Sequence, residues 1–505
     1  MDWRDQRVTV MGLGHFGGGV AAARWLARQG ARVTVTDLAD EQVLADSLAE
    51  LAGEPIAACH LGGHREEDFR APDCVVVNPA VRPGNPFVEI ARKAGARITT
   101  EIEMFIWACP ARIVGVTGSN GKSTTAAMTA AILRAAAEGN GVGAPLCKAG
   151  HRPKVGRGPL RPMSPDPFSQ ARVWLGGNLG GSLLERLDEM SPGDWTVLEL
   201  SSSQLWYMDR ETPMPHVAVV TNCTPNHLDW HGRFEDYVAA KQRVLAGQTP
   251  EDFAVLNTLD PEVRSWGGAC GTTAFGGAKV ARPPSAVEES AQPGAAVPHA
   301  ARLVPLWPEG KIPELRVPGE HNRVNAACAA AAAFAAGCDE EAIRAGLAGF
   351  TALPQRLELV AVVGGRRFCN DSSATTPEST VAALRSVQGR VWLLAGGRDK
   401  GLDFRPLGEA IVRWACGAAF YGSARDALRS EVAAHAPGFR TTSAQTMADA
   451  LAWCWEQSRP GDAILLSPAC SSQDQFQNFR RRGEHFVALV RQLAQVDKTA
   501  DCPPQ

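Results

Sequence analysis

Short apolar runs recur along this 505-residue chain, and each is followed by a glycine-rich or polar turn and then by a longer stretch of helical character. The first examples are Arg7–Met11, Arg32–Thr36 and Cys74–Val77. Runs of this length, bounded by turn residues, are typical of strands buried in a parallel sheet. Their alternation with helical stretches predicts an α/β fold.

A glycine-rich loop at 115–124 lies between an apolar run and a helical stretch. It ends in Gly121-Lys122-Ser123, as a phosphate-binding P-loop does, although its first glycine lies one residue early. Backbone N–H groups of such a loop, together with the helix N-terminus behind it, attract phosphate oxygens. We therefore predict a nucleoside triphosphate site in which Lys122 reaches the β- and γ-phosphates and Ser123 or Thr124 binds Mg²⁺.

A second glycine motif follows the first strand. Gly12, Gly14 and Gly17 have the spacing of the dinucleotide fingerprint, and Asp37 ends the next strand. This pattern predicts a Rossmann-like domain and, taken alone, favours NAD. Asn78 follows a further strand, at the carboxyl end where open α/β sheets bind ligands.

Later strands are expected at 96–99, 111–114, 195–200, 217–222, 390–395, 418–421 and 462–467. We predict three α/β domains, namely a Rossmann-like N-terminal domain at 1–110, a central P-loop domain at 111–352 and a Rossmann-like C-terminal domain at 353–494. The Gly- and Pro-rich stretches near 139–170 and 276–302 predict insertions with little regular structure, either tolerated loops or a substrate lid. The polar end at 495–505 predicts a disordered tail.

Composition excludes several classes of partner. The formal net charge is −3 and there is no long Lys/Arg run, so a nucleic-acid partner is not expected. The N-terminus is polar and leads directly into a strand, which predicts no signal peptide, and the Ala-rich run at 325–337 is too short to span a bilayer. The 13 cysteines contain no C-x-x-C pair, which favours a reducing cytoplasm.

Three polar residues of the middle segment are candidates for chemistry. Glu199 ends a strand, where a P-loop enzyme places a carboxylate for Mg²⁺, although a plain strand-end glutamate fits the spacing too. His227 follows the next strand and would hold a second Mg²⁺ or orient a phosphate, but most loop histidines do neither. Lys241 has the pattern of a solvated helix lysine.

In the third segment, polar turns follow three strands. They are 370–375 with a carboxylate and hydroxyls, 396–401 with a cation on a glycine-rich loop, and 467–472 with further hydroxyls. Each alone is compatible with ordinary turn chemistry. Because all three follow strands, we expect them to share one cleft that suits an anionic co-substrate.

Several motifs in order resemble those of the Mur ligases. They are 115–124, 198–202, 226–229, 321–325 and 353–356. Two further stretches, 393–404 and 467–483, are similar to those of the glutamate-adding members of that family. The resemblance spans nearly the whole chain except the two insertions and the tail.

The resemblance implies an ATP-dependent amide ligase of peptidoglycan precursor synthesis in the cytoplasm. The L-alanyl carboxylate of UDP-N-acetylmuramoyl-L-alanine would take the γ-phosphoryl group, and the amine of glutamate, with D-glutamate favoured, would attack the acyl phosphate. Two Mg²⁺ ions are implied as cofactors. A monomer without nucleic-acid or membrane partners is expected, whose third segment closes onto the P-loop domain.

The resemblance also assigns residues. ATP is assigned to Gly118, Asn120, Gly121, Lys122, Ser123, Thr124, Asn325, Arg356 and Asp371. The UDP-sugar is assigned to Gly12, Gly14, His15, Phe16, Gly17, Asp37, Asn78, Asn178 and Ser201. Glutamate is assigned to Thr375, Lys400, Ser472 and Phe479. The catalytic set is Lys122, Glu199, His227 and Lys241, and the metal ligands are Ser123, Glu199, His227 and a carbamoylated Lys241.

Two of these assignments replace interpretations made from the residues alone. Carbamoylation turns Lys241 from a cation into a metal-binding anion. The UDP diphosphate makes the same demands on Gly12 to Gly17 as NAD does, so NAD becomes the second choice for that site.

The chain departs from the family pattern at three positions. Ser373 stands where the family has a lysine, which leaves D- versus L-glutamate open, and Ser203 stands where it has phenylalanine. Phe16 replaces a small or hydroxylated residue. The alternatives are another amino-acid-adding ligase or a folylpolyglutamate synthase, an NAD-dependent dehydrogenase fused to a P-loop module, and a non-catalytic nucleotide sensor.

Overall fold

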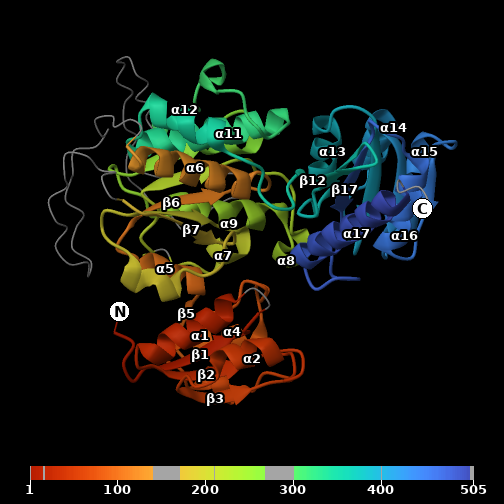
Figure 1. Cartoon of the computed structure of the whole chain (residues 1–505). Helices are drawn as coiled ribbons and strands as arrows, with labels where there is room; N and C mark the ends of the chain where they lie inside the picture. The colour runs from red at the N-terminus through yellow and green to blue at the C-terminus, as the bar shows by residue number, and fades with distance from the viewer. Residues whose placement is uncertain are drawn as a thin grey trace. The chain divides into compact units, whose positions relative to one another are not determined.

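The computed structural model describes residues 2–14, 17–139, 171–209, 211–267, 301–399 and 401–500, with side chains to residue 495. The chain groups into two compact units by its internal contacts. The first comprises Met1–Pro313 with Asn325–Gly349, and the second Glu314–Val324 with Phe350–Gln505. The three sheets of the expected α/β fold are present (Figure 1). Among the described residues, no helix is long and apolar enough to cross a membrane.

The N-terminal sheet has the order β3-β2-β1-β4-β5, and every pair in it is parallel. The order reverses between β1 and β4, so the loops that follow these two strands flank the crevice where such sheets bind ligands. The elements are β1 (Arg7–Met11), α1 (Gly18–Arg28), β2 (Arg32–Thr36), α2 (Ala45–Leu51), β3 (Ile56–His60), α3 (Glu67–Arg70), β4 (Cys74–Val77), α4 (Pro86–Lys93), β5 (Arg97–Thr99) and α5 (Glu101–Ala108).

The middle sheet has the order β11-β10-β9-β6-β8-β7 and is also parallel. Strand β6 lies between β8 and β9, so the P-loop that follows it is flanked by the loops after both neighbours. The strands are β6 (Arg112–Thr117), β7 (Val173–Gly177), β8 (Trp195–Glu199), β9 (Val217–Val220), β10 (Phe253–Leu256) and β11 (Arg302–Val304). The helices are α6 (Lys122–Ala137), η1 (Leu184–Glu189), α7 (Ser202–Trp206), α8 (Leu228–His231), α9 (Phe234–Ala246), α10 (Pro261–Trp266), η3 (Glu309–Lys311), α11 (Glu320–Ala336) and α12 (Glu340–Gly349).

Helices α6, α11 and α12 lie along one side of this sheet, and α7 and α9 lie along the other (Figure 1). Helix α12 approaches α6 so closely that a Cβ atom at Gly346 would lie 2.5 Å from the backbone of Ile132. All alanines of α11 are buried, because small side chains let this helix pack closely on its neighbours.

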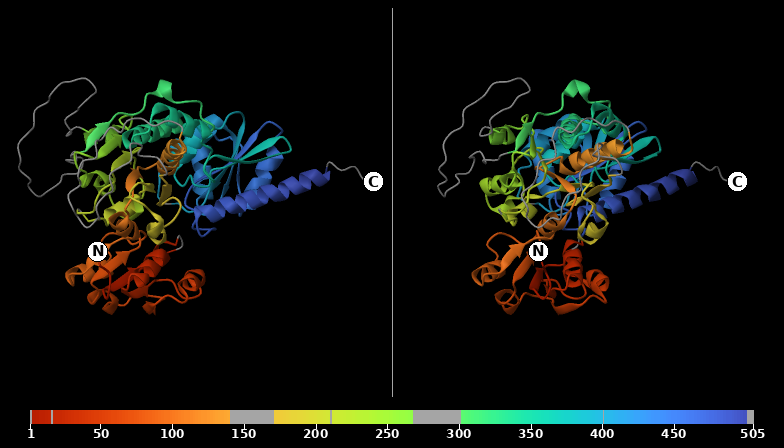
Figure 2. Two further views of the ribbon diagram at one scale, coloured as in Figure 1. Left: turned by 60° about the vertical axis from the view of Figure 1, so that its left-hand side comes forward. Right: turned by 90° about the vertical axis from the view of Figure 1, so that its left-hand side faces the viewer.

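The C-terminal sheet has the order β12-β13-β17-β14-β15-β16, and only β12 runs antiparallel to its neighbour. Its elements are β12 (Glu358–Val363), β13 (Arg366–Asn370), α13 (Pro377–Ser386), β14 (Val391–Gly396), α14 (Arg405–Trp414), β15 (Ala415–Tyr421), α15 (Arg425–His435), β16 (Thr441–Ser443), α16 (Met447–Gln457), β17 (Ala463–Ala469) and α17 (Phe479–Ala500). Figure 2 shows α17 as a long helix that runs along this unit.

Some boundaries differ from those expected. Helix α17 continues to Ala500, well into the segment expected as a tail, because that segment contains no glycine or proline before residue 501. Arg302, expected in the second insertion, begins β11. Nearly all of the first insertion and most of the second lie outside the described residues.

Candidate active site

The P-loop backbone requires glycine at two positions. Gly118 has φ +148° and Gly121 has φ +81°, values that side-chain-bearing residues rarely adopt. A Cβ atom at Gly118 would collide with Thr221 Oγ1, and one at Gly121 would collide with Asn325 Oδ1. Asn325 and the P-loop, which are far apart in the sequence, therefore lie against each other.

The loop after β9 holds the P-loop in shape. The backbone N–H of Asn120 donates to Asn222 Oδ1 at 2.7 Å, and Asn222 Nδ2 donates back to the Asn120 carbonyl at 3.0 Å. Ser119 Oγ donates to the Thr224 carbonyl at 2.8 Å, and Lys122 Nζ donates to the Ser119 carbonyl at 2.9 Å. Sequence analysis missed Asn222, although its position directly after a strand was a usable signal.

Glu199 is the centre of a buried polar cluster. Its carboxylate is 2 % exposed and accepts from Ser123 Oγ at 2.6 Å and from Asn178 Nδ2 at 2.9 Å. These donors come from the start of α6 and from the turn after β7, so three elements meet at one carboxylate. Thr124 follows in the first turn of α6, but Ser123 is the hydroxyl residue in contact with Glu199.

Lys241 is buried rather than solvated, so the interpretation made from its helical position alone is wrong. It is 1 % exposed, and its Nζ donates to the Gly118 carbonyl at 2.7 Å and lies 4.5 Å from the centre of the Tyr237 ring. Burial, followed by the charge of Lys122, holds the pKa of Lys241 well below its usual 10.5. An amine with a strongly lowered pKa is available as a nucleophile near neutral pH.

A cavity of about 210 Å³ opens beside these residues. Its lining includes Lys122, Lys241, Asn178, Ser201 and His227. His227 is exposed and has φ +54°, a left-handed backbone conformation that few non-glycine residues adopt. The sequence analysis assigned these five residues to ATP, to metal ions and to the UDP-sugar. The structure brings all five to the wall of one cavity.

Sequence analysis missed the aromatic side of this cavity. His231 is 6 % exposed, and its Nε2 lies 2.9 Å from Ser202 Oγ. Burial, with the charge of Lys241 as the second cause, lowers the pKa of His231 to about 4, so the ring is neutral at pH 7. Trp230 and Tyr237 line the cavity as well. Their spacing along the chain resembles that of ordinary core aromatics, so it carried no signal.

The glycines after β1 are packed against Asn78. Added Cβ atoms at Gly12 and Gly14 would lie 3.0 Å from Asn78 Cβ and 2.7 Å from its Nδ2. Both carboxylate oxygens of Asp37 are engaged, since Oδ2 accepts from the Leu13 N–H at 2.8 Å and Oδ1 from the Ala39 N–H at 2.9 Å. Asp37 therefore shapes this loop.

Gly17 caps α1 in the left-handed conformation, with φ +79°. His15 and Phe16, which complete the proposed UDP-sugar set, lie outside the described residues.

Asp371 is the centre of a second polar cluster, in the C-terminal unit. Its Oδ2 accepts from Ser467 Oγ at 2.8 Å, and its Oδ1 accepts from the Leu357 N–H at 3.2 Å. Burial raises the pKa of Asp371 to about 7, against the opposing effects of Ser467 and Arg356. The backbone on either side of Arg356 is unusual, because Gln355 has φ +62° and Leu357 has φ +49°.

The turns after three strands of this unit are linked, as expected for one cleft. Ser372 Oγ donates to the Phe479 carbonyl at 2.8 Å, which joins the loop after β13 to α17. The Arg398 N–H donates to the Ser471 carbonyl at 2.8 Å, which joins the loops after β14 and β17. Arg482 is fully buried and donates to the Ser372 and Cys470 carbonyls at 2.8 and 3.0 Å.

Thr375 lies partly buried in the first of these loops and Ser472 buried in the last, whereas Lys400 lies outside the described residues. Sequence analysis missed Arg482, because it stands in a run of arginines that resembles a solvated charge cluster.

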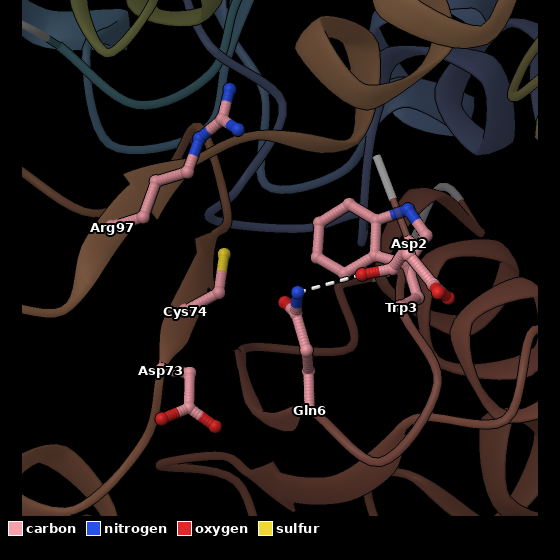
Figure 3. Close-up of a pocket in the computed structure, with 6 residues that line it drawn as sticks. All are labelled: Asp2, Trp3, Gln6, Asp73, Cys74 and Arg97. Carbon is pink, nitrogen blue, oxygen red and sulfur yellow. Dashed lines mark hydrogen bonds between the residues drawn. The ribbon is translucent and has the colours of Figure 1, made fainter.

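A larger cavity, of about 360 Å³, lies in the N-terminal domain (Figure 3). Asp2, Trp3, Gln6, Asp73, Cys74 and Arg97 line it. These residues lie at the amino ends of β1, β4 and β5, opposite the glycine loop, and burial raises the pKa of the Cys74 thiol to about 12. Ligands of open α/β sheets bind at the carboxyl ends of the strands, so size alone does not make this cavity the active site.

The residues at the P-loop suit Mg²⁺ better than a metal that prefers nitrogen or sulfur. Ser123 and Glu199 supply a hydroxyl and a carboxylate side by side, and Mg²⁺ is typically held by one or two carboxylates together with substrate phosphates and water. Within the described part of the chain, no group of three or more His, Cys, Asp or Glu side chains is arranged to hold a metal by itself.

Comparison with known families covers each domain in turn. Residues 6–100 match the MurD-like N-terminal domain of Mur ligases, residues 116–333 the Mur ligase middle domain, and residues 355–470 the Mur ligase glutamate ligase domain. The expected three-domain family architecture is thereby confirmed.

Curated relatives extend this match to the full length. The UDP-N-acetylmuramoylalanine–D-glutamate ligase of Anaeromyxobacter dehalogenans is 38 % identical over 506 residues, which cover 97 % of this chain and 98 % of the relative. The enzyme of the same name from Symbiobacterium thermophilum is 34 % identical over 502 residues, which cover 97 % of this chain and 99 % of the relative.

Solved structures share the fold at much lower identity. UDP-N-acetylmuramate-alanine ligase MurC from Thermotoga maritima matches with a TM-score of 0.55 at 17 % identity, over 96 % of this chain and 99 % of that one. MurF ligase from Thermotoga maritima in complex with ADP matches with a TM-score of 0.51 at 14 % identity, over 98 % and 96 % of the two chains. The domain matches and the full-length relatives lead to one conclusion: this chain belongs to the Mur ligase family.

Proposed function

We propose that this chain is an ATP-dependent ligase that joins D-glutamate to UDP-N-acetylmuramoyl-L-alanine in peptidoglycan precursor synthesis. The supporting observation is the cavity beside the P-loop, where Lys122 faces the same space as Asn178 and Ser201. A phosphate cradle that opens into a second binding space suits transfer of a phosphoryl group to an acceptor. The names and full-length coverage of the curated relatives support the choice of substrates.

In the proposed reaction, the L-alanyl carboxylate attacks the γ-phosphorus of ATP and ADP leaves, which gives an acyl phosphate. The amine of glutamate then attacks the acyl carbon, loses a proton, and expels inorganic phosphate. Lys122, with the backbone of Gly118 to Gly121, would hold the γ-phosphoryl oxygens as charge develops on them. Arg356, Asp371 and Asn325 are proposed contacts of the adenine nucleotide.

Ser123 and Glu199 would hold one Mg²⁺, and His227 with a carbamoylated Lys241 would hold a second. When bound, Mg²⁺ neutralises charge on the phosphoryl oxygens. The buried Glu199 carboxylate and the lowered pKa of Lys241 support these roles, since carbamoylation of an amine requires its neutral form.

The UDP moiety is proposed to bind at Gly12, Gly14 and Gly17, with His15, Phe16, Asp37 and Asn78 beside it. Glutamate is proposed to bind at Thr375, Lys400, Ser472 and Phe479. We infer a monomer that acts in the cytoplasm. The scattered cysteines, 13 in number and without a C-x-x-C pair, support a reducing compartment.

L-Glutamate is a second candidate co-substrate, because one departure from the family motif leaves the enantiomer open. Ser373 replaces the cation that the usual family motif places in this loop, so the charge pattern around the incoming amino acid differs.

The test is phosphate release from ATP with UDP-N-acetylmuramoyl-L-alanine and either D- or L-glutamate. We expect release that requires the acceptor, the nucleotide and D-glutamate. Release with L-glutamate alone would transfer the assignment to that enantiomer. Absence of release with both would refute the ligase assignment.

A further inference from the structure

The cavity beside the P-loop is too small for the whole acceptor. Its volume is about 210 Å³, below the roughly 300 Å³ at which pockets for drug-sized ligands begin. Lys122 lines it, and in the proposed function the acceptor atom nearest Lys122 is the carboxylate that takes the phosphoryl group. The part of the acceptor inside this cavity is therefore its terminal aminoacyl residue.

One wall of the cavity is rigid and aromatic. The Trp230 ring meets the Trp206 ring edge-on at 6.1 Å and the Tyr207 ring at 6.3 Å. The His231 ring lies 5.2 Å from that of Tyr237, and its Nε2 pairs with Ser202 Oγ at 2.9 Å. Aromatic side chains locked by neighbours on several sides do not adjust to the size of a ligand.

Ser203 forms a different wall, which is small and polar. Its Oγ lies 3.1 Å from Ser201 Oγ. Ser201 Oγ donates its own proton to Gln204 Oε1 at 3.0 Å and accepts the Gln204 N–H at 3.3 Å. The proton shared by the two serines therefore comes from Ser203, whose oxygen keeps lone pairs to accept a further hydrogen bond.

From this geometry we propose that Ser203 determines which terminal aminoacyl residue the acceptor carries, and that the cavity takes a seryl residue as well as an alanyl one. The hydroxyl of an L-seryl side chain would donate to Ser203 Oγ, and the small side chain of Ser203 leaves room for it. A phenylalanine, which the usual family motif has here, would occupy that room and offer no acceptor. This inference rests on the proposed function and names a second substrate of the same site.

The test compares kcat/KM for UDP-N-acetylmuramoyl-L-alanine and UDP-N-acetylmuramoyl-L-serine in phosphate release. For the unaltered protein we expect the two values to lie within about tenfold of each other. Ser203→Ala should lower the L-seryl to L-alanyl ratio by about tenfold, the usual effect of one lost hydrogen bond. Ser203→Phe should lower it by roughly 100-fold, because it also removes space.

Ser430→Ala is the matched control, since Ser430 is an exposed serine on α15 in the other unit. The L-seryl to L-alanyl ratio of kcat/KM in this variant should equal that of the unaltered protein. If Ser203→Phe does not fold, Ser203→Ala and equilibrium binding of the two acceptors decide the question.

An unchanged ratio in the Ser203 variants, or an unaltered protein that rejects the L-seryl acceptor while using the L-alanyl one, would overturn this inference and leave the ligase assignment intact. No turnover with either acceptor would instead overturn the ligase assignment, and this inference with it.

Discussion

Replacing Glu199 with glutamine separates its structural role from its proposed role in metal binding. The side chain keeps its size but loses its charge at a site that is 2 % exposed. A glutamine can match both present partners, because its oxygen can accept from Asn178 Nδ2 while its amide donates to Ser123 Oγ. The folded protein therefore keeps two hydrogen bonds where the carboxylate had two.

The two hydrogen bonds of Glu199 set the expected changes in stability. For Glu199→Gln the free energy of unfolding without metal should change by less than about 1 kcal/mol, since no buried group loses its partner. Glu199→Ala removes both hydrogen bonds and should cost about 1–3 kcal/mol, at about 0.5–1.5 kcal/mol for each. For Glu199→Gln we expect kcat to fall by roughly 10²–10³, the usual loss when one preorganised electrostatic group is removed.

The assay has two parts. Urea unfolding of the unaltered protein and both variants without divalent ions measures the structural effect. Thermal unfolding with ADP, with and without Mg²⁺, then measures metal binding, because a ligand that binds only the folded state raises the melting temperature. We expect the Mg²⁺-dependent increase in the unaltered protein and its loss in Glu199→Gln.

Two results would refute the reasoning. Normal turnover of Glu199→Gln would show that the charge is not needed for the reaction. A Mg²⁺-dependent stabilisation equal to that of the unaltered protein would show that the ion is held elsewhere.

Three further predictions concern other parts of the site. Gly121→Ala should lower ADP affinity more than tenfold in calorimetric titration, because the added Cβ atom would collide with the side chain of Asn325. Gly139→Ala is the control. Gly139 is also left-handed, but an added Cβ atom there has nothing within 4 Å, so the change should cost only about 1 kcal/mol of stability. Lys122→Met should reduce phosphate release at least about 100-fold, and near-normal release would contradict its role. Burial raises the pKa of Asp371 from 3.8 to about 7, so the folded state binds a proton that the unfolded state has lost, and stability falls as pH rises across this range. Asp371→Asn should therefore be more stable than the unaltered protein at pH 8, by up to roughly 4 kcal/mol, and no more stable at pH 3; equal pH dependence in urea unfolding would exclude the effect.

Local sequence predicted the positions that depend on backbone geometry. The glycines at 118 and 121 adopt conformations and close approaches that other residues do not, so their spacing identified the P-loop without knowledge of the fold. Glu199 was identified for a related reason. It ends an apolar run, and the carboxyl ends of parallel strands meet at one edge of a sheet.

Residues whose role depends on burial could not be identified from the local sequence. Lys241 lies on a helix with the spacing of a surface lysine, and only the resemblance to a family suggested another role. Arg482 ends a run of three arginines but is fully buried. The helical position of either side chain does not show which neighbours cover it, because those neighbours come from distant parts of the chain.

The sequence by itself determined the α/β alternation, the phosphate-binding loop and the position of Glu199 at the end of a strand, because each depends on residues close together in the chain. The contact of Glu199 with Ser123, which are 76 residues apart, was decided by the tertiary structure. Only the tertiary structure decided the cavity in which Lys122, Lys241 and Ser203 meet. These residues come from three different helices, α6, α9 and α7. Their shared environment, including the lowered pKa of Lys241, arises only when the sheet and its helices exclude water from the space between them.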